Sequence, residues 1–259
     1  MRRRVMSLGV VVCFCMALVA GLSEQKASAQ MAAEKATIYT FVMEWDVPRA
    51  MWGDYEKQMA TTGETLKKSV DDGTLVGYGI FATVAHQEGA PNHGTWITAS
   101  SIANLMKVLD VLRASPASTS PVVSASKHWD YLVSSKDYAA HSGTFTNGYL
   151  RVATWIGKEG VSDPGGKVEK ASMVALCEKL MADGALHAYS IDREIIHTMD
   201  ANAFFVVLVT NGAEGLDKFN AAVDDMGKNN PVSLAAFRSL LSDSGHRDSL
   251  SKVITTTHK

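Results

Sequence analysis

Charged and aromatic side chains gather on two predicted strands in the second half of the chain. On the strand expected at 149–156, side-chain alternation places an arginine and a tryptophan on one face. On the neighbouring strand, expected at 187–197, an arginine, a tyrosine and two histidines are spaced to share a face. Arginine binds carboxylates and other planar anions through paired hydrogen bonds. We therefore predict a site for an anionic or phenolic small molecule, formed by Arg151, Trp155, His187, Tyr189, Arg193 and His197.

The residue types suggest how such a site would work. The two arginines would hold an anionic group of the ligand, while Tyr189 or His197 would polarise the ligand or move a proton. The first half of the chain has apolar residues where the second half has these arginines, so the site is expected in the second half alone. The alternative is that both arginines lie on a solvated face, or are paired with Glu194 or Asp192. The expected ligand contacts are Arg151, Trp155, Arg193 and His187.

Other histidines recur at matched places. His86 and His197 each follow a Tyr-x-Ile motif by six residues; they are either ligands to a metal or haem iron or polar residues at a strand end. His128 and His246 are each followed two residues later by an aspartate, which would share a strand face with the imidazole and raise its basicity. The alternative for these pairs is a strand start with a capping aspartate.

The whole chain follows a duplicated pattern. The motif Tyr-x-x-Val-x-x-Trp occurs at 39–45 and again at 149–155. The motif Asp-Gly-x-Leu-x-x-Tyr-x-Ile occurs at 72–80 and again at 183–191. Because these matches keep the same order and nearly the same offset, they indicate a duplicated domain with a first repeat at 36–138 and a second at 149–259, joined by a small polar linker.

Each repeat reads as strand, helix, strand, strand, helix, strand, which is the ferredoxin-like order. Two helices cover one face of such a sheet, and the other face stays apolar and needs a partner. The predicted fold class is therefore α+β, with two tandem ferredoxin-like repeats whose sheets pack face to face as a pseudo-two-fold barrel or sandwich.

This arrangement resembles the dimeric α/β-barrel superfamily, through its element order, its duplication and the Gly-x-Leu-x-x-Tyr join after the first helix of each repeat. The resemblance covers nearly all of the mature chain, which is expected to begin at Gln30. It implies a fold shared by cofactor-free monooxygenases, isomerases and haem proteins such as the chlorite dismutase and dye-peroxidase groups. Under the haem alternative, His197 or His246 is the expected axial ligand, in the second repeat only.

The first 29 residues are predicted to be a signal peptide. They begin with three arginines, continue with an apolar run too short to span a bilayer comfortably, and end in Ala27-Ser28-Ala29. Cleavage would leave Cys177 as the single cysteine, with no internal disulfide possible, and would change the formal net charge from −2 to −5. The expected location is periplasmic or extracellular. Nucleic acid is rejected as a partner because no basic patch stands out, and no membrane association is expected after cleavage.

The predicted function is an exported small-molecule-binding protein, with a cofactor-free monooxygenase-like activity as the leading hypothesis. No cofactor is predicted, because the chain lacks a phosphate loop and the His-Glu-x-x-His and Cys-x-x-Cys motifs. Haem binding is the first alternative, and a non-catalytic interaction protein is the second. The chain is expected to be a monomer with pseudo-two-fold symmetry or a homo-oligomer.

Overall fold

The computed structural model describes residues 35–259, and the predicted signal peptide lies outside the described residues. Within them, Ala36–Lys259 forms a single unit. The first repeat contains β1 (Ile38–Asp46), α2 (Trp52–Asp71), β2 (Gly77–Thr83), β3 (His93–Ala99), α3 (Ile102–Ala114), α4 (Pro121–Ala125) and β4 (Lys127–Ala140). The second contains β6 (Tyr149–Ile156), α5 (Lys167–Glu169), α6 (Ala175–Ala182), β7 (Leu186–Glu194), β8 (Ala203–Thr210), α7 (Ala213–Asn229), α8 (Pro231–Ser239) and β9 (Arg247–His258).

The strands form one closed antiparallel barrel. Their order is β2-β3-β1-β4-β7-β8-β6-β9, and pairing of β2 with β9 closes the ring. Each repeat contributes its strands in the same internal order, with the first strand between the third and the fourth, as a ferredoxin-like unit requires. The predicted α+β class, the ferredoxin-like units and their barrel arrangement are therefore confirmed.

Two long strands join the repeats. The first part of β4 pairs with β1, and its last residues pair with β7 of the other repeat. In the same way, β9 pairs with β6 through its first half and with β2 through its second half. The segment expected to be only a polar linker departs from that expectation: β4 runs on to Ala140, and a short strand β5 (Gly143–Phe145) pairs with the end of β9.

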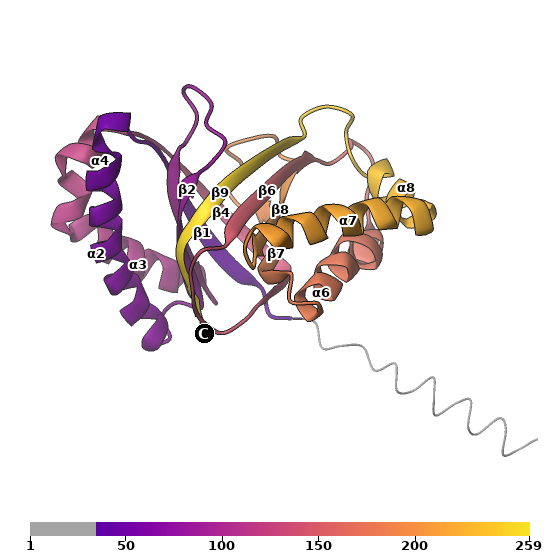
Figure 1. Cartoon of the computed structure of the whole chain (residues 1–259), viewed down its shortest axis with the longest axis horizontal. Coiled ribbons are helices and arrows are strands. Elements are labelled where there is room, and N and C mark those ends of the chain that lie inside the picture. Colours follow the sequence, from indigo (N-terminus) through magenta and orange to yellow (C-terminus); the bar gives the residue numbers. More distant parts are fainter. Residues whose placement is uncertain (1–34) are drawn as a thin grey trace, which may run out of the picture. The chain divides into compact units, whose positions relative to one another are not determined.

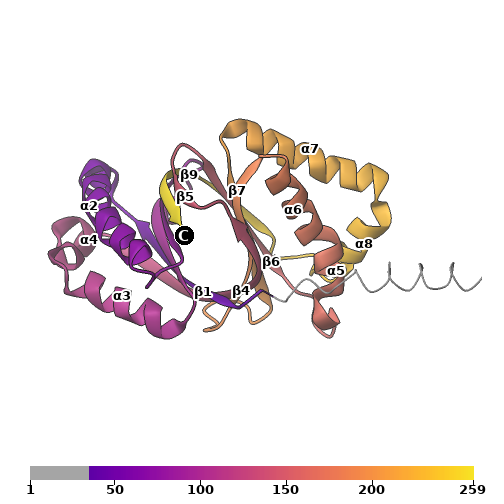
Figure 2. The ribbon, with the colours of Figure 1, turned by 90° about the horizontal axis from the view of Figure 1, so that it is seen from below.

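The helices cover the outside of the barrel. Figures 1 and 2 show α2, α3 and α4 on the side of the first repeat and α6, α7 and α8 on the side of the second. Separate apolar cores lie between each helix layer and its strands, around Leu66 and Ile97 in the first repeat and around Leu180 and Leu208 in the second. A third apolar cluster, including Phe81 and Val253, fills the barrel interior. No helix of residues 35–259 is long and apolar enough to cross a membrane.

Matched glycines turn the chain from the first helix of each repeat into the next strand. Gly73 follows α2 with a φ of 83°, and Gly184 follows α6 with a φ of 66°. This left-handed conformation costs glycine little, because it has no Cβ. The duplicated Asp-Gly motif therefore marks the same helix C-terminus twice.

Candidate ligand-binding site

The predicted arginines of the second repeat are already bound to protein groups. The Arg193 guanidinium donates to Glu169 Oε2 at 2.6 Å and lies 4.9 Å from the centre of the Phe204 ring. Arg151 pairs with Asp248 at 3.2 Å and lies 4.8 Å from the centre of the Phe219 ring. Both positive charges are therefore neutralised within the chain.

The expected grouping of side chains on one face holds for four of the six residues. Across the sheet, Leu208 of β8 lies between Tyr189 of β7 and Arg151 of β6. Phe204 of β8 lies in the same way between Arg193 and Trp155. This face is the outer one, covered by helices. Tyr189 is 3% exposed, and its hydroxyl donates to Glu178 Oε1 at 2.5 Å. Burial raises the Tyr189 pKa, and the contact with Glu178 raises it further.

His187 and His197 do not join that group. A β-bulge between Leu186 and Ala188 shifts the alternation of β7, so His187 stacks on Phe145 at 4.4 Å. Because β7 ends at Glu194, His197 falls in the following loop and is exposed. The expectation of a shared strand face was therefore wrong for both histidines.

The carboxylates expected as arginine partners serve other groups. Glu194 accepts hydrogen bonds from the backbone amides of Thr198 and Met199, and so holds the loop after β7. Asp192 accepts from Ser135 across the β4–β7 seam. Burial raises the pKa of Asp192 to about 6. The arginine partners are Glu169 and Asp248 instead.

The histidines considered for haem do not fit an axial ligand. The His246 ring stacks on Trp155 at 3.6 Å; its Nδ1 lies 3.1 Å from the Thr154 carbonyl oxygen and its Nε2 lies 3.3 Å from Asp248. Both ring nitrogens are thus engaged, and His197 lies on an exposed loop. No group of three or more His, Cys, Asp or Glu side chains within residues 35–259 is arranged to hold a metal ion.

The first repeat presents a different situation under α2. Tyr55 is 0% exposed and His93 is 1% exposed, with their ring centres 4.9 Å apart. Within the described part of the chain, neither the Tyr55 hydroxyl nor His93 Nε2 has a hydrogen-bond partner. Burial raises the Tyr55 pKa, and the Thr95 hydroxyl opposes this rise, although that hydroxyl donates to Met59 Sδ. Buried polar atoms without a partner are costly, so this pair requires an explanation.

The hydrogen-bond network behind His93 sets its tautomer. The Asn92 side-chain amide donates to Asp46 and to the Val47 carbonyl, so Asn92 Oδ1 faces the other way and accepts from the Val47 amide. His93 Nδ1 lies 2.7 Å from the same Oδ1 and must donate to it. Nε2 therefore carries a bare lone pair, in a ring whose centre lies 4.9 Å from that of Tyr55.

The electrostatic surroundings keep His93 neutral. Burial, with a smaller contribution from His86, lowers the His93 pKa to about 4. The Glu56 carboxylate, which is half exposed, lies 3.9 Å from Nε2, beyond hydrogen-bond distance but next to the lone pair. Trp52 packs against both His93 and His86. The group offers an imidazole base, a phenol donor and a carboxylate that reaches solvent.

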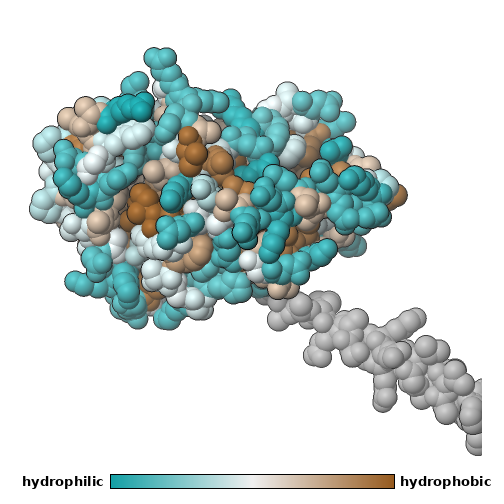
Figure 3. All heavy atoms as spheres, viewed as in Figure 1, coloured by the Kyte–Doolittle hydropathy of each residue, from teal (hydrophilic) through white to brown (hydrophobic). Residues whose placement is uncertain are grey.

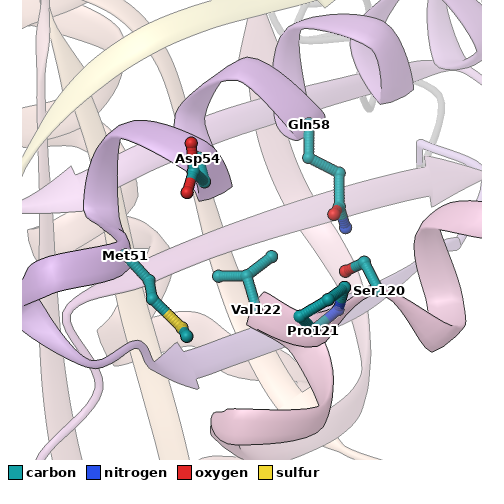
Figure 4. A pocket seen from close by; sticks show the side chains of 6 residues that line it. All are labelled: Met51, Asp54, Gln58, Ser120, Pro121 and Val122. Carbon is teal, nitrogen blue, oxygen red and sulfur yellow. The ribbon is translucent and has the colours of Figure 1, made fainter.

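A surface hollow lies between α2 and α4, in the same repeat as this pair. Its volume is about 240 Å³, and Figure 4 shows its side chains on the two helices. Two of them, Met51 and Val122, belong to the apolar cluster that contains Tyr55. Figure 3 shows hydrophobic surface between the helices of the first repeat and the barrel strands. The hollow is lined by Met51, Asp54, Gln58, Ser120, Pro121 and Val122.

The sequence patterns only partly indicated these residues. Tyr55 falls in the apolar stripe of a helix, where an aromatic residue reads as core. His93 reads as part of a glycine-containing loop near His86 and Glu88, although it is the first residue of β3. The signal that marks them is a missing hydrogen-bond partner, which becomes visible only in three dimensions.

Comparison with known proteins supports the fold. No protein-family model matches the sequence, and no curated protein matches it significantly. A protein provisionally assigned as a monooxygenase, from Fusobacterium nucleatum subsp. nucleatum, matches with a TM-score of 0.60 and 9% identity, over 87% of this chain and 95% of the other. An anthrone oxidase-like protein matches with a TM-score of 0.50 and 12% identity, over 88% and 95%. A provisionally assigned chlorite dismutase matches with a TM-score of 0.54 and 8% identity, over 85% and 95%.

These similarities concern backbone arrangement. Identities of 8 to 12% carry no residue roles from those proteins to this chain. They do agree with the observed strand order, the duplicated repeats and the outer helices. The chain has the dimeric α/β-barrel fold, built here from two ferredoxin-like repeats within one polypeptide.

Proposed function

We propose that this protein binds a small phenolic molecule between α2 and the sheet of the first repeat, and acts on it as a cofactor-free, monooxygenase-like enzyme. The observation that carries the proposal is the pair of buried, unpartnered atoms, Tyr55 hydroxyl and His93 Nε2, within the described residues. One phenolic oxygen placed between them would satisfy both, donating to His93 and accepting from Tyr55. Trp52 and Met59 supply apolar surroundings for a ring.

The proposed chemistry begins with proton transfer. The phenolic O–H bond breaks as its proton passes to His93 Nε2, and the phenolate oxygen keeps the electron pair and a hydrogen bond from Tyr55. Glu56, beside Nε2 and half exposed, would pass the proton on to solvent. The phenolate is the electron-rich form of the ring, and it is the form that reacts more readily with an oxidant. The histidine pKa of about 4 belongs to the buried ring without a ligand.

Access requires a small movement of the helix layer. The hollow of about 240 Å³ is slightly smaller than a ligand pocket of roughly 300 to 1,000 Å³. The hollow shares Met51 with the Tyr55 cluster, and also Val122 of α4, a helix of five residues that begins at Pro121. Displacement of α4 would extend the hollow to the two unpartnered atoms.

The comparisons are compatible with this proposal but do not distinguish it from the alternatives. Among proteins of this fold are one provisionally assigned as a monooxygenase and one named as anthrone oxidase-like. The alternative location, the arginine group of the second repeat, would require a ligand to displace Glu169 or Asp248 from its ion pair. Haem remains the alternative cofactor at the level of fold alone, because His246 has both nitrogens engaged.

A titration with 4-nitrophenol tests the location and the chemistry together, because its absorbance distinguishes phenol from phenolate. Binding should raise the melting temperature by mass action. Tyr55→Phe and His93→Asn should abolish this rise, since asparagine keeps a donor toward Asn92 and removes Nε2. Arg151→Ala and Arg193→Ala, the matched controls, should leave the rise intact.

Other results would redirect the assignment. Loss of binding in the arginine variants alone would place the ligand in the second repeat. No binding in any variant or in the parent protein would favour a non-catalytic interaction protein. A Soret band on titration with haemin, lost in His246→Ala or His197→Ala, would establish the haem alternative.

We also propose that the protein is exported, to a periplasmic or extracellular location, because of the sequence features of residues 1–29. The mature chain would begin at Gln30. The intact mass of the protein recovered from the periplasm or the culture medium tests this, and recovery of the full-length chain from the cytoplasm would contradict it.

A further inference from the structure

Three histidines from separate segments meet where the two repeats are joined at one end of the barrel. His141 follows β4, His187 lies in β7, and His258 is the last residue of β9. The His187 ring centre is 5.9 Å from that of His141 and 5.8 Å from that of His258. On its other side His187 stacks nearly parallel on Phe145 of β5, at 4.4 Å and 12°.

We propose that His141, His187 and His258 form an acid-sensitive latch, which releases β5 and the end of β9 when these rings become protonated. The cluster is separate from the proposed ligand site, and the inference does not rest on the proposed function. Its basis is the third buried polar atom that lacks a partner among residues 35–259, His187 Nε2. His187 is 6% exposed.

The hydrogen bonds around His258 fit a neutral ring. Thr256 Oγ1 donates to the Tyr78 carbonyl at 2.8 Å, so in its contact with His258 Nε2 at 3.1 Å it must accept. His258 Nδ1 is then a bare acceptor, and it lies so close to Gly77 that a Cβ there would be 2.6 Å away. A proton added to Nδ1 would therefore lie against Gly77 of β2.

The charges that act on the His187 and His258 rings come from the histidines themselves, and the Asp72 carboxylate nearby interacts with Lys259. His141 disfavours protonation of His187, and His187 disfavours protonation of His258. Among the nearby ionisable residues, the Tyr138 hydroxyl donates to the Ala36 carbonyl, and the Lys259 ammonium lies beside Gly73. β5 contributes Gly143, Thr144 and Phe145, which carry no ionisable side chain.

The direction of the pH effect follows from burial. Burial lowers the pKa of His187 and of His258 from 6.5 to about 4. In the open state both rings return to the ordinary value, so the open state binds more protons between these limits. The closed state is therefore fully favoured above pH 6.5 and loses its advantage as pH falls toward about 4.

The segment expected to open is weakly held. β5 pairs with only three residues of β9, and its own residues are mostly exposed. Two side-chain hydrogen bonds add to this pairing. One joins Thr144 Oγ1 and Thr257 Oγ1 at 3.0 Å, and in the other Ser142 Oγ donates to the Lys259 carbonyl at 3.0 Å. Release of Phe145 from His187 would remove the ring stacking that adds to these bonds and to the packing of Phe145 against the barrel interior.

Hydrogen exchange measured as protection factors, which correct for the intrinsic pH dependence of exchange, tests the latch. Between about pH 7 and pH 4.5, protection of β5 and of residues 255–258 should fall on the order of 100-fold for each buried histidine. Amides of α2 and α6 should stay protected. His187→Phe keeps a ring on Phe145 but cannot be protonated, so it should reduce the fall in protection of β5 by about 100-fold. His93→Asn should leave the fall in protection of β5 unchanged.

Several outcomes would overturn the latch. Loss of protection in all elements together would show global acid unfolding. Unchanged protection of β5, or an identical fall in His187→Phe, would show that these rings do not control the opening. Stabilisation of the parent protein by Zn²⁺ at neutral pH, absent in His187→Phe, would identify a metal site in place of a latch.

Discussion

Replacing Tyr55 by phenylalanine should make the ligand-free protein more stable. Phenylalanine keeps the ring that fills the cluster with Val47 and Val122, and removes only the hydroxyl. A buried polar atom without a partner costs about 1 to 3 kcal/mol. Because the Tyr55 hydroxyl has no partner among the described residues, its removal should raise the free energy of unfolding by about 1 to 2 kcal/mol.

Urea denaturation followed by tryptophan fluorescence measures this gain. The midpoint should increase with an unchanged slope, since the surface exposed on unfolding is the same. The melting temperature should rise by roughly 2 to 8 °C, at about 2 to 4 °C for each kcal/mol in a unit of this size. Tyr189→Phe is the matched control, and it should have the opposite sign because it removes the hydrogen bond to Glu178.

Two results would refute the reasoning. A loss of stability in Tyr55→Phe would mean that the hydroxyl has a hydrogen-bond partner, and Thr95, which affects the Tyr55 pKa, is the candidate. A change smaller than about 0.5 kcal/mol would mean that water already satisfies the hydroxyl. Either result would also remove the main support for a ligand at this position. We expect Tyr55→Phe to be more stable than the parent protein and to have lost 4-nitrophenol binding.

Three further predictions concern pH, ion pairs and packing. Burial keeps His93 neutral by lowering its pKa from 6.5 to about 4. The stability that the neutral ring contributes is therefore present above pH 6.5 and declines as pH falls toward 4. In His93→Asn, the free energy of unfolding measured against pH should lose on the order of 3 kcal/mol of its change over that range. Arg193→Ala should cost about 1 to 3 kcal/mol in urea denaturation, because the arginine is half exposed but its partner Glu169 is buried and would lose its cation; a loss below about 0.5 kcal/mol would show that the carboxylate reaches solvent. Gly79→Ala should destabilise by about 1 to 3 kcal/mol, because its Cβ would lie 2.0 Å from Trp96; circular dichroism melts showing no loss would mean that the tryptophan can move aside.

The fold could be predicted because its determinants are local or repeated. The motifs at 39–45 and 149–155 are strands β1 and β6 in equivalent places of the barrel. Glycines 73 and 184 end the matching helices. The open face of one ferredoxin-like unit demanded a second sheet, and the tandem copy supplied it. These features depend on periodicity and backbone conformation, which a sequence displays directly.

The candidate site could be predicted less well, because it depends on partners distant in the sequence. Alternation correctly placed Arg151 with Trp155, but it did not show that Asp248, 97 residues later, would neutralise the arginine. Strict alternation also placed His187 on the wrong face, because the strand pattern in the sequence does not reveal the bulge between Leu186 and Ala188. Tyr55 and His93 looked ordinary because a missing partner leaves no mark on the sequence.

The placement of β9 governs when this polypeptide can become a finished barrel. Residue 258 pairs with residue 77, so ring closure joins segments some 180 positions apart, and β9 leaves the ribosome after the seven other strands of the barrel. Until then, the edges of β2 and β6 have no neighbour, and exposed edges invite pairing with other chains. Such contacts between distant segments form slowly. A nascent chain therefore has two unpaired strand edges until β9 is made, and a chaperone would be most useful during that time. Loss of β9 would leave both edges unpaired.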